Sequence, residues 1–200
     1  STKHDPVAAM LASSTASVIG THPLFGPGVH SLQGQRIAIT PGRLVDGTDW
    51  MTWLTSTLRA AGLTLLETTP EDHDRVMAVV QVLTHFSTEV IGRTMEHLDV
   101  SIEETLRFTS PIYHLELLMT ARHFAQSPNL YSAIQMSNPN TKEVATAFRA
   151  AAAEFDALVQ SGDAAAFREA FGEVSAFFGD FAETALAEST HLIDRLVERS

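Results

Sequence analysis

The feature that most limits how this chain can fold is a change of pattern near Pro70. Before it, apolar runs of strand length alternate with helical patterns, which is typical of a mixed or parallel sheet. After it, apolar residues recur with helical spacing to the end. We therefore predict a mainly α fold with a small α/β N-terminal part over residues 1–68 and an all-helical part over residues 69–200.

Turn and cap residues give the expected boundaries. Asp5 is expected to cap the first helix, with Pro6 at its first position, and Gly62 to close the second helix. In the helical part, turn-forming residues separate about six helices, of which the last is long and ends near Glu198. The expected strands are 17–20, 36–40 and 63–67, and the expected N-terminal helices are 6–11 and 48 or 49 to about 61.

Composition limits the classes of partner. The 200 residues are 44% hydrophobic and 18% charged, which indicates a folded globule. With 13 basic and 24 acidic residues, the formal charge of −11 argues against nucleic acid and an anionic membrane surface. A small anionic substrate stays compatible, because a few local cations can dominate a cleft. The chain has no cysteine, no signal peptide and no apolar run near the ~20 residues of a membrane span, so we expect a cytoplasmic protein.

Residues 20–27, Gly-Thr-His-Pro-Leu-Phe-Gly-Pro, follow the first expected strand. Their glycines and prolines predict a stiff turn. His22 would then lie at the C-terminal end of a strand, where open α/β sheets present residues to ligands. From the spacing alone, a loop histidine without a function is an equally good interpretation.

The same stretch resembles the His-Pro-Met-Phe-Gly-Pro turn of prephenate dehydrogenases. Other segments resemble this family in the same order along nearly the whole chain, which is more specific than any single motif. They are Ser1-Thr2-Lys3 (family Ser-Val-Lys), 81–86 (Gln-Val-Leu-Thr-His-Phe; family Gln-x-Leu-x-His-Phe), 110–113 (Ser-Pro-Ile-Tyr), 122–126 (Arg-His-Phe-Ala-Gln) and 178–181 (Phe-Gly-Asp-Phe).

The resemblance implies the end of a Rossmann-like nucleotide-binding domain at 1–68 and a helical substrate-binding and dimerisation domain at 69–200. It also implies NAD or NADP as cofactor, although no Gly-x-Gly-x-x-Gly loop follows a strand here and Pro23 is the single candidate cofactor contact. The chain is then a fragment of a longer enzyme or a natural short form, and its orphan strands favour the fragment.

By resemblance, His22 contacts the ring hydroxyl of prephenate, a small anionic cyclohexadienyl compound, and a neutral imidazole suits general-base work near pH 7. Ser1 is expected to join the hydrogen-bond network of this histidine, and Lys3 to assist substrate binding. No metal is expected.

Arg122 shares a helix face with His114. The resemblance predicts that its guanidinium binds the ring carboxylate, whereas a salt bridge to a neighbour such as Glu116 is the interpretation without it. Gln81 and His85 recur at a helical spacing of four. The resemblance places them beside the substrate, while the spacing alone would equally suit a solvated stripe.

Two positions depart from the family pattern. Several relatives have an acidic residue where this chain has Gly28, and many have arginine where it has His114, a candidate substrate contact. Loss of that cation would weaken the binding of one carboxylate, or shift preference toward arogenate or an amino-substituted prephenate.

Apolar residues of the C-terminal helices are expected in the core and between helices, and the resemblance adds a homodimer formed through the helical domain. Two alternatives stay open. One is a cofactor-free lyase, in which His22 would protonate the ring hydroxyl. The other is a non-catalytic helical dimerisation module. The apolar residues of the C-terminal helices that are expected to pack in the core and between helices are Phe155, Leu158, Phe167, Phe171, Phe177 and Phe178.

Overall fold

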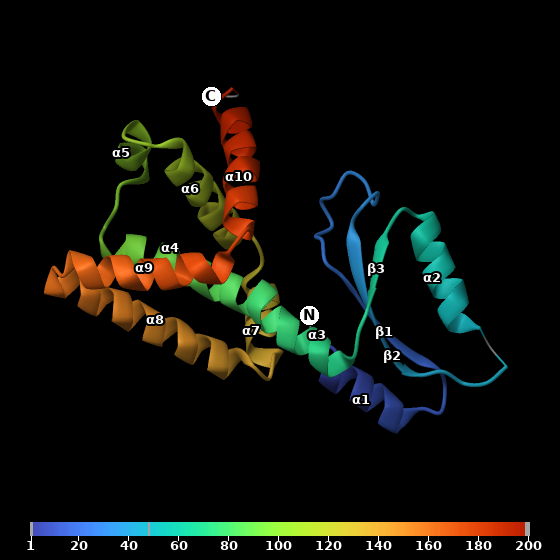
Figure 1. The fold of residues 1–200 in the computed structure, drawn as a ribbon. Coiled ribbons are helices and arrows are strands. Elements are labelled where there is room, and N and C mark those ends of the chain that lie inside the picture. Colours follow the sequence, from blue (N-terminus) through green and yellow to red (C-terminus); the bar gives the residue numbers. More distant parts are fainter. Residues whose placement is uncertain (1, 48, 199–200) are drawn as a thin grey trace. The chain divides into compact units, whose positions relative to one another are not determined.

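The computed structural model of the chain describes residues 2–47 and 49–198. The chain divides into two compact units. All three strands of the described residues lie in unit 1, and Figure 1 shows that helices follow them, so the predicted fold class is confirmed. Unit 1 comprises Ser1–Thr84 and Asn129–Val144, and unit 2 comprises His85–Pro128 and Ala145–Ser200.

Unit 1 contains a mixed sheet in the order β1-β2-β3 (Figure 1). β1 (Val18–Pro23) pairs with β2 (Arg36–Arg43) in antiparallel fashion, and β2 pairs with β3 (Thr64–Glu67) in parallel fashion. The alternation of strands and helices predicted this mixed sheet, because a helix between two strands permits a parallel pair.

β1 is longer than predicted. The expected strand ended at Gly20, but pairing continues through His22 opposite Ala38 and Pro23 opposite Ile37. The expectation that a turn begins at Gly20 is therefore wrong, because the neighbouring strand supplies ladder hydrogen bonds that local sequence does not reveal. His22 consequently sits on the strand itself, where the sheet fixes its backbone.

Gly20 allows β1 to approach its surroundings closely. A Cβ atom at Gly20 would overlap the hydroxyl oxygen of Thr40 and lie 3.0 Å from Cγ2 of Val7 and 3.2 Å from Cδ of Lys3. The missing side chain therefore lets β2, α1 and the segment before α1 meet at one point. This point borders the core of the sheet, where the buried residues of β2 are Ile37, Ala38, Ile39 and Thr40.

α1 (His4–Ser13) packs against β1 and β2 but does not begin as predicted. Asp5 is not its cap: the N-cap residue is Lys3, which makes no side-chain cap hydrogen bond. The carboxylate of Asp74, distant in sequence, accepts hydrogen bonds from the backbone nitrogens of Lys3 and His4 instead. A tertiary contact thus replaces the local cap.

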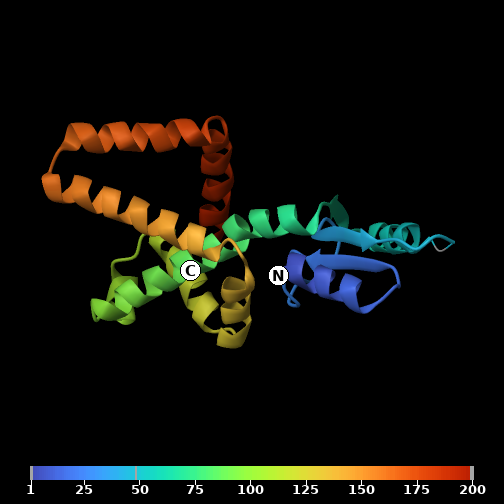
Figure 2. The same cartoon turned by 90° about the horizontal axis from the view of Figure 1, so that it is seen from below.

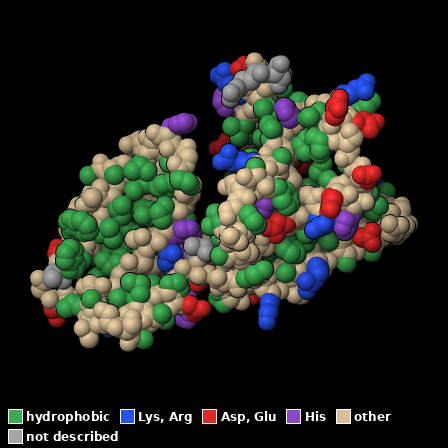
Figure 3. All heavy atoms as spheres, turned by 180° about the vertical axis from the view of Figure 1, so that it is seen from behind, with side chains coloured by type: hydrophobic (Ala, Val, Ile, Leu, Met, Phe, Trp, Pro, Cys, Tyr) green, Lys and Arg blue, Asp and Glu red, His purple; other side chains and the backbone are tan. Residues whose placement is uncertain are grey.

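α2 (Trp50–Ala60) has the predicted ends. The carboxylate of Asp49 accepts a hydrogen bond from the backbone nitrogen of Thr52 at 3.2 Å, and Gly62 follows with a φ of 88°. Trp50, in the first turn of this helix, is 50% exposed. Figure 3 shows hydrophobic side chains gathered on one face of the strand-containing unit.

α3 (Pro70–Met77) follows the sheet, and Thr69 caps it through a hydrogen bond from the backbone nitrogen of Asp72 at 3.1 Å. It packs against β2 and α1. The helix then widens to a π-helix, η1 (Ala78–Leu83), before α4 begins at Thr84. Sequence periodicity did not reveal this π-helical segment, which resembles α-helix in its apolar pattern.

Residues 70–197 form eight α-helices and η1, where about six helices were expected. The additional boundaries lie at η1 and at Gly179, whose φ of 51° separates α9 from α10. Figures 1 and 2 both show α10 turning sharply away from α9. The remaining helices are α4 (Thr84–His97), α5 (Ile102–Arg107), α6 (Pro111–Phe124), α7 (Pro128–Ser137), α8 (Thr141–Ser161), α9 (Ala164–Phe178) and α10 (Phe181–Val197).

The aromatic residues of α8 and α9 are only partly packed. The rings of Phe155 and Phe167 meet edge to face at 6.0 Å. In contrast, Phe171 is 63% exposed and Phe177 is 83% exposed, so for these two the expectation of core or helix–helix packing is wrong within this chain. Among the described residues, no helix combines the length and apolar character needed to cross a bilayer.

Candidate active site

His22 on β1 meets a second imidazole, which comes from α3. Its Nδ1 is 2.8 Å from Nε2 of His73, and the ring centroids are 5.0 Å apart in an edge-to-face arrangement. Nδ1 of His73 is in turn 2.7 Å from Oδ1 of Asp74. All three residues belong to unit 1, so strand and helix together build a row of ionisable groups that ends at His22.

Burial keeps both rings neutral. The pKa of His22 is lowered to about 3, first by burial and further by positive charge nearby, including that of Lys3. Burial also lowers the pKa of His73, against the opposing effect of its hydrogen bond to Asp74. Near pH 7 the two imidazoles are therefore uncharged, the state in which a ring nitrogen can accept a proton.

Asp74 anchors this cluster and is only 1% exposed. Its carboxylate accepts hydrogen bonds from the backbone nitrogens of Lys3 at 2.7 Å and His4 at 3.0 Å. Its backbone carbonyl accepts a hydrogen bond from Nδ2 of Asn138 at 2.9 Å. Adjacent backbone nitrogens thus satisfy the carboxylate, as a buried charge requires, and Asn138 holds the backbone that carries it.

Sequence reasoning missed His73 and Asp74. The available signal was their place on α3: both lie on the buried face that also carries Met77. Charged and polar residues seldom occupy such positions unless they have partners. Two of them in succession therefore indicate a buried polar cluster, although the pattern alone does not say that His22 is its partner.

Of the two N-terminal predictions, Ser1 lies outside the described residues. Lys3 is half-buried beside the cluster, and its Nζ donates a hydrogen bond to the backbone oxygen of Thr2 at 3.1 Å. Burial lowers the pKa of Lys3, while the charge of Asp74 raises it. The structure therefore brings Lys3 close enough to His22 for its charge to act on the imidazole.

Gln81 lies in η1, also in unit 1. Its side-chain oxygen is buried and has no hydrogen-bond partner within residues 2–47 and 49–198. A buried amide oxygen without a donor is costly, and π-helical turns are frequent at functional sites. Gln81 thus has an acceptor available for a bound molecule.

His85 begins a second group of polar residues, in unit 2. Its ring centroid is 5.4 Å from that of His123 on α6, and Nε2 of His123 is 3.2 Å from Oε1 of Glu89. Burial lowers the pKa of His85, His123 lowers it further, and Glu89 opposes the shift. Sequence reasoning placed neither His123 nor Glu89 in the site, because their proximity depends on how α4 and α6 pack.

Arg122 and His114 both lie on α6. The Arg122 side chain is exposed, and its guanidinium has no hydrogen-bond or ion-pair partner in the described part of the chain, Glu116 included. His114 is half-buried. The predicted residues thus fall into two groups: His22, Lys3 and Gln81 in unit 1, and His85, His114 and Arg122 in unit 2.

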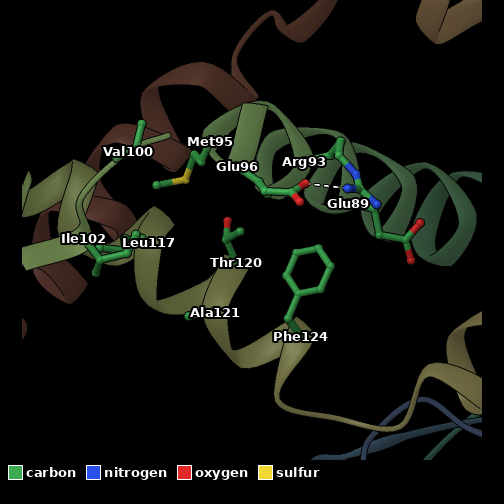
Figure 4. Close-up of a pocket in the computed structure, with 11 residues that line it drawn as sticks. Glu89, Arg93, Met95, Glu96, Val100, Ile102, Leu117, Thr120, Ala121 and Phe124 are labelled. Carbon is green, nitrogen blue, oxygen red and sulfur yellow. Dashed lines mark hydrogen bonds and ion pairs between the residues drawn. The ribbon is translucent and has the colours of Figure 1, made fainter. Parts of the chain in front are cut away.

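Unit 2 also contains a pocket of about 680 Å³ between α4 and α6, which Figure 4 shows. The ring of Phe124 fills one side of it, and a Cβ atom at Gly92 would overlap this ring. Glu89, Arg93 and Glu96 are the charged residues of its wall, and the last two form an ion pair. None of the predicted site residues lines this pocket.

Comparison with known protein families decides the family. The family model described as "Prephenate dehydrogenase, dimerization domain" matches residues 69–173, about half of the chain. The chain belongs to the prephenate dehydrogenase family.

Relatives in this family match well beyond the helical part. The chain is 37% identical over 167 residues to the protein named "Probable arogenate/prephenate dehydrogenase" from Methanocaldococcus jannaschii, a match that covers 84% of this chain and 37% of that protein. It is 36% identical over 193 residues to the "T-protein" of Enterobacter agglomerans, which covers 96% of this chain and 51% of that protein. The chain therefore spans about half, or less, of the length of these relatives.

A solved structure from this family shares the fold. Prephenate dehydrogenase from A. aeolicus, in complex with hydroxyphenyl propionate and NAD+, aligns with a TM-score of 0.58 and 19% sequence identity. The alignment covers 84% of this chain and 58% of that one.

The residues of the present 200-residue chain do not by themselves fit a dinucleotide. Its sequence has no Gly-x-Gly-x-x-Gly loop to hold the phosphates. Pro23, the predicted cofactor contact, is exposed at the end of β1 and has no backbone N–H to donate. Among the described residues, no three His, Asp or Glu side chains group as metal ligands.

Proposed function

We propose that this chain is the catalytic and dimerisation part of a prephenate dehydrogenase. The reaction is the NAD(P)-dependent oxidative decarboxylation of prephenate, or a close analogue, to 4-hydroxyphenylpyruvate in tyrosine biosynthesis. One observation carries the proposal: in a member of this family, His22 is a neutral, half-buried imidazole whose Nδ1 is bonded to His73 at 2.8 Å. Such a group is prepared to take a proton at its other nitrogen.

His22 accepts the proton of the ring hydroxyl of the substrate. Its low pKa of about 3 describes the free site, where burial and the charge of Lys3 disfavour the imidazolium. A bound substrate with two carboxylates adds negative charge, which raises the pKa of the imidazole and makes it a better base when it is needed. Lys3 then has a second role, as one of the cations that attract the anion.

Arg122 binds a carboxylate of the substrate. Its guanidinium is exposed and unpaired in the described part of the chain, and its planar fork matches a carboxylate with two parallel hydrogen bonds. Gln81, His85 and His114 supply further polar contacts to the substrate. Ser1 assists His22, as the family resemblance implies.

The nicotinamide cofactor would be held mainly by residues that this chain does not contain, since its phosphate-binding loop is absent from the sequence. We therefore expect the chain to be inactive by itself. We also propose a homodimer formed through the helical domain, supported by the family model and by the exposed aromatic residues of α9. The cytoplasm remains the expected location on the sequence grounds given above.

Incubation with prephenate tests the proposal. The complete protein that contains this chain should release 4-hydroxyphenylpyruvate only when NAD or NADP is present, and the His22→Asn variant should lose on the order of 10²–10⁴-fold in kcat. Formation of phenylpyruvate without cofactor would favour a lyase instead. Absence of any turnover in the complete protein would leave a non-catalytic dimerisation module.

A further inference from the structure

The cluster around His22 contains one group whose role as an acceptor is fixed by geometry. The carboxylate of Asp74 receives two backbone N–H groups, from Lys3 at 2.7 Å and His4 at 3.0 Å, and backbone nitrogens can only donate. The same carboxylate is 2.7 Å from Nδ1 of His73. Nδ1 of His73 must therefore carry a hydrogen and donate it to Asp74.

This assignment fixes the other nitrogen of His73. Burial keeps the ring neutral by lowering its pKa, and a neutral imidazole has one N–H group. With the hydrogen on Nδ1, the Nε2 atom of His73 has a free lone pair and can only accept. It lies 2.8 Å from Nδ1 of His22, so Nδ1 of His22 carries a hydrogen as well.

The tautomer of His22 follows by elimination. Its single hydrogen is on Nδ1, so Nε2 is bare, and no described residue donates a hydrogen bond to it. A bare nitrogen is what a general base requires, whereas the opposite tautomer would present an N–H group to a hydroxyl. An imidazole without a partner samples both tautomers.

We propose that His73 and Asp74 are positioning residues that hold His22 in the one tautomer able to act as a base at Nε2, and that they share the positive charge once His22 is protonated. The proposal rests on the proposed function only in the identity of the proton donor, the ring hydroxyl of the substrate.

The proton movement is balanced within these groups. The O–H bond of the substrate hydroxyl breaks and an N–H bond forms at Nε2 of His22. The resulting imidazolium strengthens its Nδ1–H hydrogen bond to Nε2 of His73, whose far side is held by the carboxylate of Asp74. The hydroxyl of the aromatic product recovers the proton at the end, so no outside acid or base is consumed.

The tautomer can be measured directly on this chain, without any activity. In nitrogen NMR spectra of the chain labelled with ¹⁵N-histidine, with His22 assigned from the His22→Asn variant, Nδ1 of His22 should be protonated and Nε2 bare. The His73→Leu variant removes the acceptor and should populate both tautomers, whereas His73→Gln keeps an acceptor oxygen and should retain the wild-type form. A protonated Nε2 in the wild-type chain, or an unchanged His22 spectrum in His73→Leu, would overturn the inference.

A matched control is another histidine that contacts α3. His4 on α1 bonds to Glu71 on α3 through its Nδ1 at 2.9 Å, at an exposed site. The His4→Leu variant therefore removes a histidine contact between α1 and α3 and should leave the His22 spectrum unchanged. If His73→Leu does not fold, the spectra of the wild type and of His73→Gln still decide, because they report the predicted tautomer directly.

Kinetics of the complete protein tell whether His73 orients the imidazole of His22 or only stabilises the fold. His73→Leu should lower kcat on the order of 10²-fold while KM for prephenate changes by less than about threefold, and His73→Gln should recover about tenfold of the loss. A normal kcat in His73→Leu, or no recovery with His73→Gln, would contradict the role. If the complete protein does not act on prephenate while the spectra show the predicted tautomer, the proposed function fails and the inference about His22 stands.

Discussion

At the scale of single residues, burial lowers the pKa of His22 to about 3, and Nδ1 of this imidazole lies 2.8 Å from Nε2 of His73. Sequence could single out His22, Arg122 and Lys3, because their motifs are local and resemble those of a known family. It could not single out His73 or Asp74 as partners of His22. Their proximity results from the packing of α3 against β2, which no local pattern specifies.

The lowered pKa of His22 makes stability depend on pH. In the unfolded chain the imidazole titrates near 6.5, and in the folded protein near 3. Between these values the unfolded state binds more protons, so the free energy of unfolding should fall as pH falls from 6.5 toward 3. We expect a loss of about 1 kcal/mol between pH 6.5 and 5, since the half-exposed ring is partly screened.

Urea titrations at several pH values measure this effect. The His22→Asn variant should show a shallower decline below pH 6.5 than the wild type, because asparagine does not titrate. His30→Asn, at an exposed loop position, should follow the wild-type curve. Parallel curves for the wild type and His22→Asn would show that the imidazole does not resist protonation in the folded state.

The exposed Arg122 is the residue proposed to bind a substrate carboxylate. Replacing it with alanine removes up to two charge-assisted hydrogen bonds to a carboxylate, so KM for prephenate should rise on the order of 10²-fold in the complete protein. Arg122→Lys should recover only part of this, since an ammonium group cannot bind in bidentate fashion. Steady-state kinetics check the result against Arg75→Ala, which removes an exposed arginine paired with Asp72. An unchanged KM in Arg122→Ala would remove it from the substrate site.

At the scale of elements, tertiary contacts override local signals. The end of β1 is set by its ladder with β2, so the strand passes through a Gly-Thr-His-Pro segment that by itself favours a turn. The first turn of α1 is capped by a carboxylate from α3. In contrast, the cap at Asp49 was predicted from the sequence. The cap at Thr69 is of the same local kind, because in both the donor and the acceptor are three residues apart.

Gly20 gives a test of how tightly these elements meet. Alanine at this position would overlap Thr40 and approach Val7, so β1 or α1 must shift, and the protein should lose about 1–3 kcal/mol of unfolding free energy. Gly26→Ala is the matched control, because no atom lies within 4 Å of the added Cβ there. Thermal and urea unfolding measure both variants. Equal stability of Gly20→Ala and Gly26→Ala would show that the contact can relax freely.

At the scale of the whole molecule, the chain leaves aromatic surface uncovered in its last helices. Phe177 and Phe181 are 83% and 61% exposed, and Leu186 is 70% exposed. The sequence singled out Phe177 as a packed apolar residue, but periodicity could not tell burial within one chain from burial between two. The family model, named for dimerisation, matches residues 69–173 and ends before these residues, so the second interpretation stays part of the proposal.

If the proposed homodimer uses this surface, a charged residue in it should weaken the dimer. Phe177→Asp would place a carboxylate in an apolar contact, which we expect to raise the dimer dissociation constant at least on the order of 10²-fold. Met136→Asp is the control, because Met136 is similarly exposed, at 84%, but lies on α7. Sedimentation velocity over a range of concentrations measures both. A Phe177→Asp chain that sediments like the wild type would place the interface elsewhere.

The anchor at Asp74 has a consequence for how this chain tolerates variation. Its carboxylate binds the main-chain nitrogens of residues 3 and 4, so these hydrogen bonds do not depend on which side chains stand there. Substitutions at position 4 can therefore accumulate without releasing the carboxylate that orients His73. Proline is the exception, since it has no hydrogen on its nitrogen, and one such change would disturb the contacts of His22 without altering His22, His73 or Asp74.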